Sequence, residues 1–215
     1  MVYTKHNKIY RVFYLSLVFI LRSIFKLLFR VETYNFENIP SQGKLILCSN
    51  HVSYIDPVMI GAFINRYIYF MAKIELFKNR FLSAVVTFLN AFPVNRTATD
   101  RSSIRTAVEV LKEGQMLALF PEGTRSVNGI IREGKKGVGL ISVMSKAPII
   151  PVAIKNTNKI VQKPKKRLFF PKVKMIAGSL IEVDEIIGKY PKKEATAIIV
   201  SMVMDEIKKL HNKIS

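Results

Sequence analysis

Acidic residues and cysteines are scarce in this chain. Its 215 residues include 15 Asp and Glu and a single cysteine, Cys48. One cysteine excludes a disulfide framework and a cysteine-rich zinc site. The apolar fraction of 49% excludes a disordered chain and a collagen-like one, and the length predicts one domain with at most an appendage.

The shortage of acid leaves a large positive charge. Lys and Arg number 34, so the formal net charge is +19, which indicates an anionic partner such as a membrane surface, a nucleic acid or a phosphorylated substrate. Residues 1–30 and 163–174 each carry six basic residues and no acidic one, interleaved with apolar side chains. This pattern favours contact with an anionic bilayer. A solvated basic face and nucleic-acid binding are the alternatives, and the sequence contains no nucleic-acid reader motif.

Residues 1–36 are interpreted as a basic amphipathic membrane-binding segment, and residues 37–215 as the α/β domain. The longest uncharged run near the N-terminus is 12–21, ten residues, whereas a spanning helix needs about 20. A helix over 8–30 places its basic residues in one arc, which predicts a helix lying in the membrane plane. A signal peptide is the main alternative, but no small-residue cleavage site follows. For the second uncharged stretch, 81–95, a buried helix is the default interpretation and a shallow membrane insertion the alternative.

From residue 44 onward strand signals alternate with helix signals. Short apolar runs predict strands, at 44–49, 67–72, 115–120, 148–154 and 172–183. Helical spacing and starts at Asp56 and Asp100 predict helices, at 57–64, 100–114, 137–145 and 193–211. The alternation predicts an α/β fold with a central, largely parallel or mixed sheet flanked by helices.

The segment NHVSYID, residues 50–56, carries the first chemical signal. His51 lies at a predicted strand-to-helix junction, five residues before Asp56. An imidazole is the usual general base near neutral pH, and a carboxylate that accepts its Nδ1–H fixes the tautomer. A capping histidine beside a plain helix-start aspartate is the simpler interpretation of this segment alone. Cys48 is a further candidate nucleophile, although a cysteine on a buried strand is usually a small apolar packing residue.

Two proline-bearing loops supply candidate phosphate ligands. FPEGTRS (120–126) follows a predicted strand directly, and it holds an acceptor, a hydroxyl and a guanidinium in Glu122, Thr124 and Arg125. FPVNR (92–96) ends in Arg96. Because arginine grips phosphate bidentately, two arginines from separate loops suggest a phosphate clamp. Taken singly, each arginine is more simply explained as a surface residue.

Together these segments resemble the glycerolipid acyltransferase family, most closely its PlsC-type members. The matching blocks are NHVSYID, FPVNR, FPEGTRS and APIIPVAI (147–154), which span about half of the chain. The resemblance implies that His51 is the general base and Asp56 its orienting partner. It also implies that Glu122, Gly123, Thr124 and Arg125, with Arg96, hold the glycerol phosphate.

The reaction that the resemblance implies is acyl transfer from acyl-CoA or acyl carrier protein to the sn-2 hydroxyl of lysophosphatidic acid, giving phosphatidic acid. It requires no metal and no organic cofactor. The protein is then expected at the cytoplasmic face of the cell membrane, as a peripheral or monotopic protein. Another lysophospholipid or glycerol-3-phosphate as acceptor, a catalytically silent relative and a nucleic-acid-binding protein are the alternatives.

Overall fold

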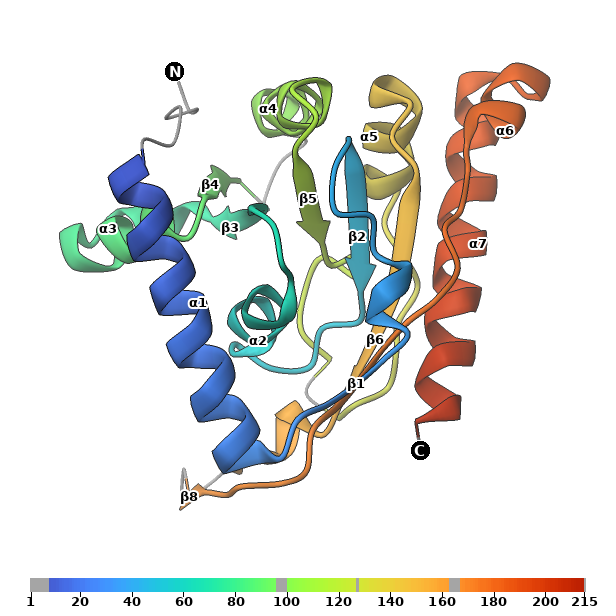
Figure 1. Cartoon of the computed structure of the whole chain (residues 1–215). Coiled ribbons are helices and arrows are strands. Elements are labelled where there is room, and N and C mark those ends of the chain that lie inside the picture. The colour runs from blue at the N-terminus through green and yellow to red at the C-terminus, as the bar shows by residue number, and fades with distance from the viewer. Residues whose placement is uncertain (1–7, 96–99, 127, 163–166, 215) are drawn as a thin grey trace.

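Short runs of branched and other apolar residues form a seven-stranded sheet at the centre of the molecule (Figure 1). The computed structural model describes residues 8–95, 100–126, 128–162 and 167–214. The strands of the sheet, in spatial order, are β1 (Glu32–Tyr34), β9 (Lys174–Ala177), β6 (Ile149–Lys155), β2 (Leu45–Ser49), β5 (Met116–Leu119), β3 (Ile68–Lys73) and β4 (Ala91–Val94). β9 is antiparallel to β6, and the other neighbouring pairs are parallel. The predicted α/β fold with a largely parallel or mixed sheet is confirmed.

Helices cover both faces of this sheet. One face is covered by α1 (Lys8–Phe29) and α2 (Asp56–Phe63), and the other by α4 (Arg101–Lys112), α5 (Gly137–Ser145) and α7 (Lys192–Lys213). The remaining elements are short, namely α3 (Arg80–Phe88), α6 (Asp184–Lys189), the 3-10 helices η1 (Phe36–Asn38), η2 (Ile74–Phe77) and η3 (Thr157–Lys159), and the pair β7 (Val161–Gln162) and β8 (Arg167–Leu168).

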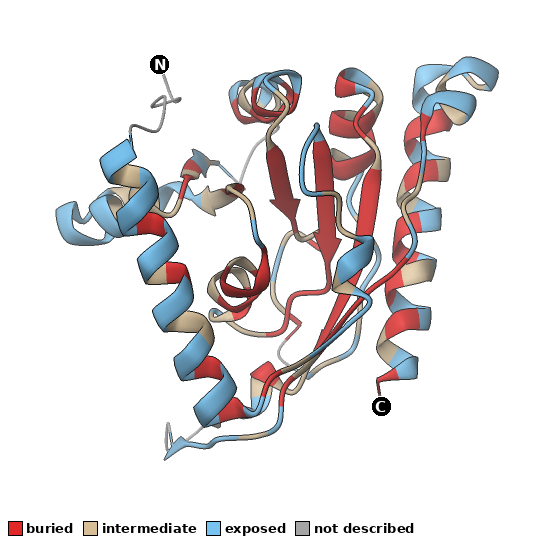
Figure 2. Ribbon diagram, in the orientation of Figure 1, coloured by how far each residue is buried: buried red, intermediate tan, exposed pale blue. Residues whose placement is uncertain are grey.

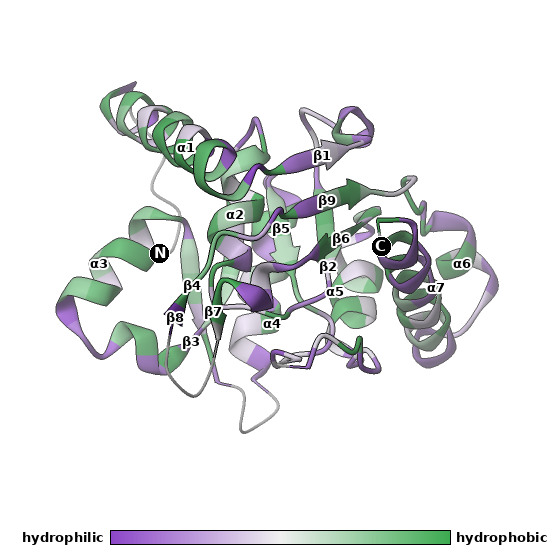
Figure 3. Ribbon diagram, turned by 90° about the horizontal axis from the view of Figure 1, so that it is seen from below, coloured by the Kyte–Doolittle hydropathy of each residue, from purple (hydrophilic) through white to green (hydrophobic). Residues whose placement is uncertain are grey.

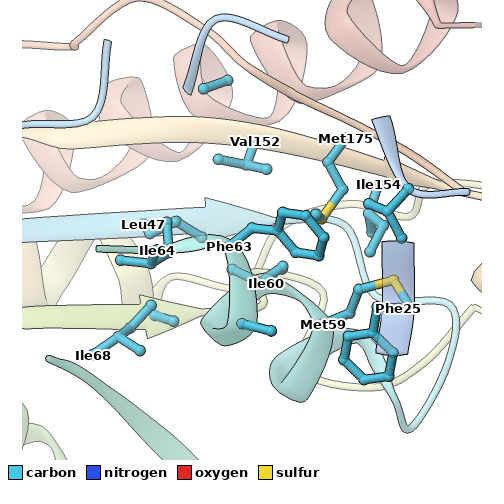
Figure 4. Close-up of a cluster of buried hydrophobic side chains, with 14 of the residues drawn as sticks. Phe25, Leu47, Met59, Ile60, Phe63, Ile64, Ile68, Val152, Ile154 and Met175 are labelled. Atoms are coloured by element: carbon cyan, nitrogen blue, oxygen red, sulfur yellow. The ribbon is translucent and has the colours of Figure 1, made fainter. Parts of the chain in front are cut away.

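The strand period of two divides the core into two parts. On β2, Leu45 and Leu47 face the layer of α1 and α2, whereas Ile46 and Cys48 face the layer of α4, α5 and α7. Figure 2 shows that the central strands are buried along their length. Figure 4 shows the first part of the core, in which side chains of α2 lie between the sheet and Phe25 of α1. Burial on both faces is why the central strands are continuous apolar runs in the sequence.

The N-terminal helix α1 is docked on the rest of the chain by polar contacts as well as by apolar packing. Tyr10 Oη donates to the carbonyl oxygen of Phe88 at 2.7 Å. Arg22 donates from Nε to the carbonyl oxygen of Ala62 at 2.7 Å, and from Nη2 to Oδ1 of Asn65 at 2.8 Å. These contacts tie both halves of α1 to α2 and to the end of α3. The helix expected over 8–30 is therefore present, with one face turned inward.

The outer face of α1 is apolar and exposed. Its largest exposed side chains include Phe13, Phe19 and Leu27. By length and composition the helix is also apolar enough to cross a membrane. Basic residues interrupt its apolar runs, which is why the sequence predicts a helix in the membrane plane.

The stretch 81–95 differs from its default interpretation. It forms α3 followed by the edge strand β4, and no residue of α3 is buried. Phe81 at the start of the helix is 75% exposed. The expectation of a buried helix is therefore wrong. An apolar run of this length has the same sequence pattern in a helix buried in the protein core and in a helix inserted shallowly in a membrane.

The close contact between α5 and α7 depends on a glycine. A methyl group added at Gly139 would overlap the carbonyl oxygen of Thr196, whereas one added at Gly137 on the same helix would meet no atom within 4 Å. We therefore expect Gly139→Ala to lower the free energy of unfolding by about 1–3 kcal/mol, the usual cost of overpacking. Gly137→Ala, the matched control, should change it by less than about 1 kcal/mol. Urea denaturation in detergent measures both, and equal effects would contradict the packing assigned to Gly139.

Candidate functional site

The candidate site lies where four neighbouring parallel strands end. The order β6, β2, β5, β3 brings together the segments that follow these strands. They supply Thr157 after β6, His51 after β2, Glu122 after β5, and Lys73 at the end of β3. Ligands of open α/β sheets bind outside the carboxyl ends of the strands. The side chains that carry the motifs are therefore gathered where this fold class places its sites.

His51 and Asp56 form a buried hydrogen-bonded pair. His51 Nδ1 lies 2.9 Å from Oδ2 of Asp56. The same oxygen accepts the backbone N–H of Val52 at 2.8 Å and of Ser53 at 2.7 Å. Because a carboxylate only accepts, Nδ1 carries the proton, and Nε2 is left as the basic nitrogen. The ring of His51 stacks on Phe120 with 4.1 Å between centroids, which fixes its plane.

Asp56 has one further partner, Thr157, that the sequence analysis did not find. Its Oδ1 accepts from the hydroxyl of Thr157 at 2.6 Å, and both residues are fully buried. The helix α2 begins at Asp56 itself, and its carboxylate turns back toward the preceding loop instead of capping the helix. Thr157 is 101 residues from Asp56 in the chain, and no local pattern indicates it.

Asn50 connects the ends of β2 and β6 beside the pair. Its side chain accepts from the backbone N–H of Ile154 at 2.8 Å and donates to the carbonyl oxygen of the same residue at 2.9 Å. A side-chain amide thus replaces a backbone peptide in the ladder. The chain is free to leave β2 at this point, and His51 turns toward the cavity described below.

Glu122 joins two loops of the site. Its Oε1 accepts the backbone N–H of His51 at 3.0 Å, and its Oε2 accepts the backbone N–H of Arg132 at 3.0 Å. The carboxylate is buried, and hydrogen bonds from both sides compensate for its desolvation. Ser126 adds a third link, because its N–H donates to the carbonyl oxygen of His51 at 2.7 Å. Glu122 therefore holds the loop of His51 in place, and its predicted contact with substrate stays a prediction.

Gly123, Thr124 and Arg125 form the rest of this loop. Gly123 has a φ of 69°, and a methyl group there would meet the side chain of Lys135, so both its conformation and its surroundings favour glycine. The guanidinium of Arg125 lies 3.2 Å from the ring centroid of Tyr54, a cation–π contact that orients it. Arg96, the other predicted clamp residue, lies outside the residues that the structure describes.

Cys48 does not face this site. It is fully buried on the opposite face of β2, and burial raises the pKa of its thiol. A thiol needs a lowered pKa to act as a nucleophile, so the alternative of a cysteine nucleophile is wrong. Within the described ranges, no group of three or more His, Cys, Asp and Glu is arranged to hold a metal ion.

A cavity of about 610 Å³ opens beside His51. Its lining is mainly apolar and comes from α1, α2, α3 and β3, with Val18, Val58, Phe70 and Val86 as examples. The polar groups on its wall include His51, Lys73, Glu75, Thr124 and Arg125. Its volume lies within the range of small-molecule pockets, about 300–1,000 Å³. An apolar ligand with a polar or anionic end matches this lining.

Lys73 is a further residue that the sequence analysis missed. It ends β3 next to β5, lines the cavity, and pairs with Glu75 at 3.1 Å. It adds a second cation to the cavity wall that carries Arg125. Its position after a predicted strand, in a fold that places its site at strand ends, is the signal that could have identified it.

Known proteins share both the sequence and the fold. The family profile described as Acyltransferase matches residues 30–155. The 1-acyl-sn-glycerol-3-phosphate acyltransferase of Bacillus subtilis is 33% identical over 86% of this chain and 89% of its own length, and that of Borreliella burgdorferi is 29% identical over 80% and 69%. The crystal structure of PlsC, the 1-acyl-sn-glycerophosphate acyltransferase of Thermotoga maritima, matches with a TM-score of 0.73 and 27% identity, over 91% of this chain and 79% of that one. The chain belongs to the acyltransferase family, as its motifs indicate.

The contact between Thr157 and Asp56 gives a test of the site. Thr157→Val keeps the shape of the side chain but removes the donor, so one oxygen of a buried carboxylate loses its partner, at a cost of about 1–3 kcal/mol in stability. Since the same carboxylate orients His51, we expect kcat for acyl transfer to fall about tenfold or more with little change in KM. Thr157→Ser keeps the hydroxyl and should restore most of kcat. If the valine variant had the kcat and pH profile of the wild type, Thr157 would have no part in positioning the histidine.

Proposed function

We propose that this protein transfers a fatty acyl chain from an acyl thioester to the sn-2 hydroxyl of lysophosphatidic acid and so forms phosphatidic acid. The observation that carries the proposal is the position of His51, which is paired with the buried Asp56 at 2.9 Å and lies on the wall of a mainly apolar cavity that also carries Arg125. The names of the relatives support the acceptor. Acyl-CoA and acyl carrier protein are the candidate donors, since both carry the chain as a thioester.

In the proposed mechanism His51 acts as the general base. Nε2 takes the proton of the sn-2 hydroxyl, and the resulting alkoxide attacks the thioester carbonyl carbon. The tetrahedral intermediate then collapses, the C–S bond breaks, and the thiolate leaves with the proton returned by His51. Asp56 holds the imidazole through Nδ1 and stabilises its protonated form.

The anionic end of the acceptor is assigned to the basic groups of the cavity wall. Arg125 and Lys73 line the cavity together with Thr124. A guanidinium binds phosphate through two parallel hydrogen bonds, and an ammonium adds a point charge. Gly123 lets the loop backbone approach closely, and Arg96 remains the predicted partner of Arg125 from the neighbouring loop.

The apolar part of the cavity is assigned to an acyl chain. Its lining between α1, α2 and β3 contains few polar groups, and each buried methylene contributes about 0.8 kcal/mol. α1 supplies Tyr14, Val18 and Leu21 to this wall. Residues 1–36, proposed as the membrane-binding segment, therefore also complete a cavity of the domain formed by residues 37–215.

Membrane attachment is proposed through the outer face of α1, on the cytoplasmic side. A spanning helix would have to give up the hydrogen bonds from Tyr10 and Arg22 to the α/β domain, so a monotopic helix accounts better for the docking. The exposed apolar side chains supply insertion, and basic residues near an anionic surface add about 1 kcal/mol each. This arrangement brings the cavity to the leaflet in which a lysophospholipid resides.

The proposed activity is tested with purified protein, an acyl thioester and a panel of acceptors. We expect phosphatidic acid from lysophosphatidic acid, and much slower transfer to glycerol-3-phosphate or other lysophospholipids. His51→Ala should lower kcat by about 10³-fold or more, because it removes the general base. Asp56→Asn should lower it by about 10²- to 10⁴-fold, since it disturbs the tautomer of His51.

His211→Ala on α7, a histidine that does not line the cavity, is the matched control and should keep full activity. Circular dichroism verifies that each variant is folded. Near wild-type turnover in the folded His51→Ala variant would refute the mechanism.

The phosphate assignment predicts an effect on KM. A hydrogen bond to a charged group contributes about 1.5–3 kcal/mol, so Arg125→Ala should raise KM for lysophosphatidic acid about 10- to 150-fold with a smaller change in kcat. Arg125→Lys should recover part of this loss. Arg105→Ala on α4 removes the same charge from an exposed position elsewhere and should leave KM unchanged. An unchanged KM in Arg125→Ala would remove this residue from the phosphate site.

A further inference from the structure

The short helix α3 has no core of its own. None of its nine residues is buried, although Phe81, Leu82 and Val85 are large apolar side chains. These three residues lie on one side of the helix, at positions i, i+1 and i+4. Ile74 and Leu76 of the preceding η2 are exposed as well. Exposing the apolar side of a helix to water costs free energy, and contiguous exposed apolar side chains usually mark an interaction site. We therefore interpret this side of α3 as an interaction surface.

α3 is held against the N-terminal helix. Tyr10 of α1 donates to the carbonyl oxygen of Phe88 at 2.7 Å and to Oδ1 of Asn90 at 3.0 Å. The rings of Tyr10 and Phe88 are in contact, with 5.3 Å between centroids. Figure 3 shows apolar residues along both helices. The exposed apolar sides of α1 and α3 therefore belong to one connected part of the molecule.

The charges around this part favour an anionic partner. Residues 8–29 and 74–88 contain six basic residues and one acidic residue, Glu75, which pairs with Lys73. Two of the basic residues, Lys78 and Arg80, flank the start of α3. A second copy of this chain, bound through the same surface, would bring two sets of like charges together. An anionic phospholipid leaflet satisfies both the apolar side chains and the charges.

We propose that α3 is a second membrane-inserting element, which enters the same leaflet as α1 with Phe81, Leu82 and Val85. The cavity borders both helices, because Val86, next to Leu82 around α3, and Val18, on the inward side of α1, line it. Insertion of both α1 and α3 fixes the orientation of the domain on the leaflet, whereas insertion of α1 alone would let the domain rotate about the axis of α1. The cavity between them then faces the lipid. This inference rests on the proposed membrane attachment through α1.

The chain contains no tryptophan, so single tryptophans report on single positions. Three full-length variants are compared, namely Phe81→Trp on α3, Phe19→Trp on α1 and Met202→Trp on α7; the replaced side chains are 75%, 69% and 42% exposed. The probe is a vesicle of phosphatidylglycerol and phosphatidylcholine, with or without brominated acyl chains. We expect a blue shift and quenching by the brominated lipid for Phe81→Trp and Phe19→Trp, and neither for Met202→Trp. Acyl transfer in detergent verifies that each variant is folded.

The outcomes separate the two proposals. Quenching of Phe19→Trp alone would overturn the role of α3 and leave attachment through α1 intact. Absence of quenching in both would overturn the attachment as well. A blue-shifted Phe81→Trp spectrum without vesicles, unaffected by brominated lipid, would identify a contact between protein copies and overturn the proposal.

A charge substitution gives a second measurement. Phe81→Glu places an acid on the inserted side of α3, so we expect the apparent affinity for these vesicles to fall about tenfold or more, the effect of losing one buried aromatic side chain. Met202→Glu is the charge-matched control and should bind as the wild type does. Equal vesicle binding by Phe81→Glu and the wild type would contradict insertion of α3.

Discussion

The carboxylate of Asp56 is the point on which the geometry of the site depends. It is fully buried, and hydrogen bonds from the imidazole of His51, two backbone N–H groups and the hydroxyl of Thr157 compensate for its desolvation. These donors come from the loop after β2 and from the segment after β6. The histidine is therefore oriented only when both strands are in register.

The carboxylate of Glu122 is also buried, and hydrogen-bond donors likewise compensate for its desolvation. It accepts from backbone N–H groups on both sides. In the described part of the chain neither carboxylate forms an ion pair with Arg or Lys. Because the two acids are satisfied by N–H and O–H donors, the positive charge of Arg125 is not neutralised by them. The guanidinium of Arg125 therefore remains available to an anionic group, as the proposed binding of a phosphate requires.

The sequence predicted those parts of the molecule that have local signatures. The apolar runs of β2, β5 and β6 identify central strands because both of their faces are buried. Asp100 accepts the N–H groups of Ser102 and Ser103 at the start of α4, as a helix-capping aspartate should. Hydrogen bonds from the N–H of Asn95 and the hydroxyl of Ser102 lower its pKa to about 2. His51 and Asp56 are five residues apart at one strand-to-helix junction, so their spacing suggested the pair, which the family resemblance then favoured. A contact between residues far apart in the chain has no local sequence pattern, which is why Thr157 was missed. The default interpretation of 81–95 was wrong for another reason: the spacing of apolar residues is the same in a core helix and in a helix with an exposed apolar side, such as α3.

The position of Cys48 has a practical consequence. It is one residue away from the end of β2, three residues before His51, and it faces the core layer of α4, α5 and α7. The strand that carries it must open before a thiol reagent can reach it, because the side chain is fully buried and its thiol resists ionisation. The labelling rate of this single native thiol thus reports how often the central sheet opens. A folded protein released from the proposed membrane attachment would react slowly and an unfolded one fast, so the same reaction distinguishes the two states.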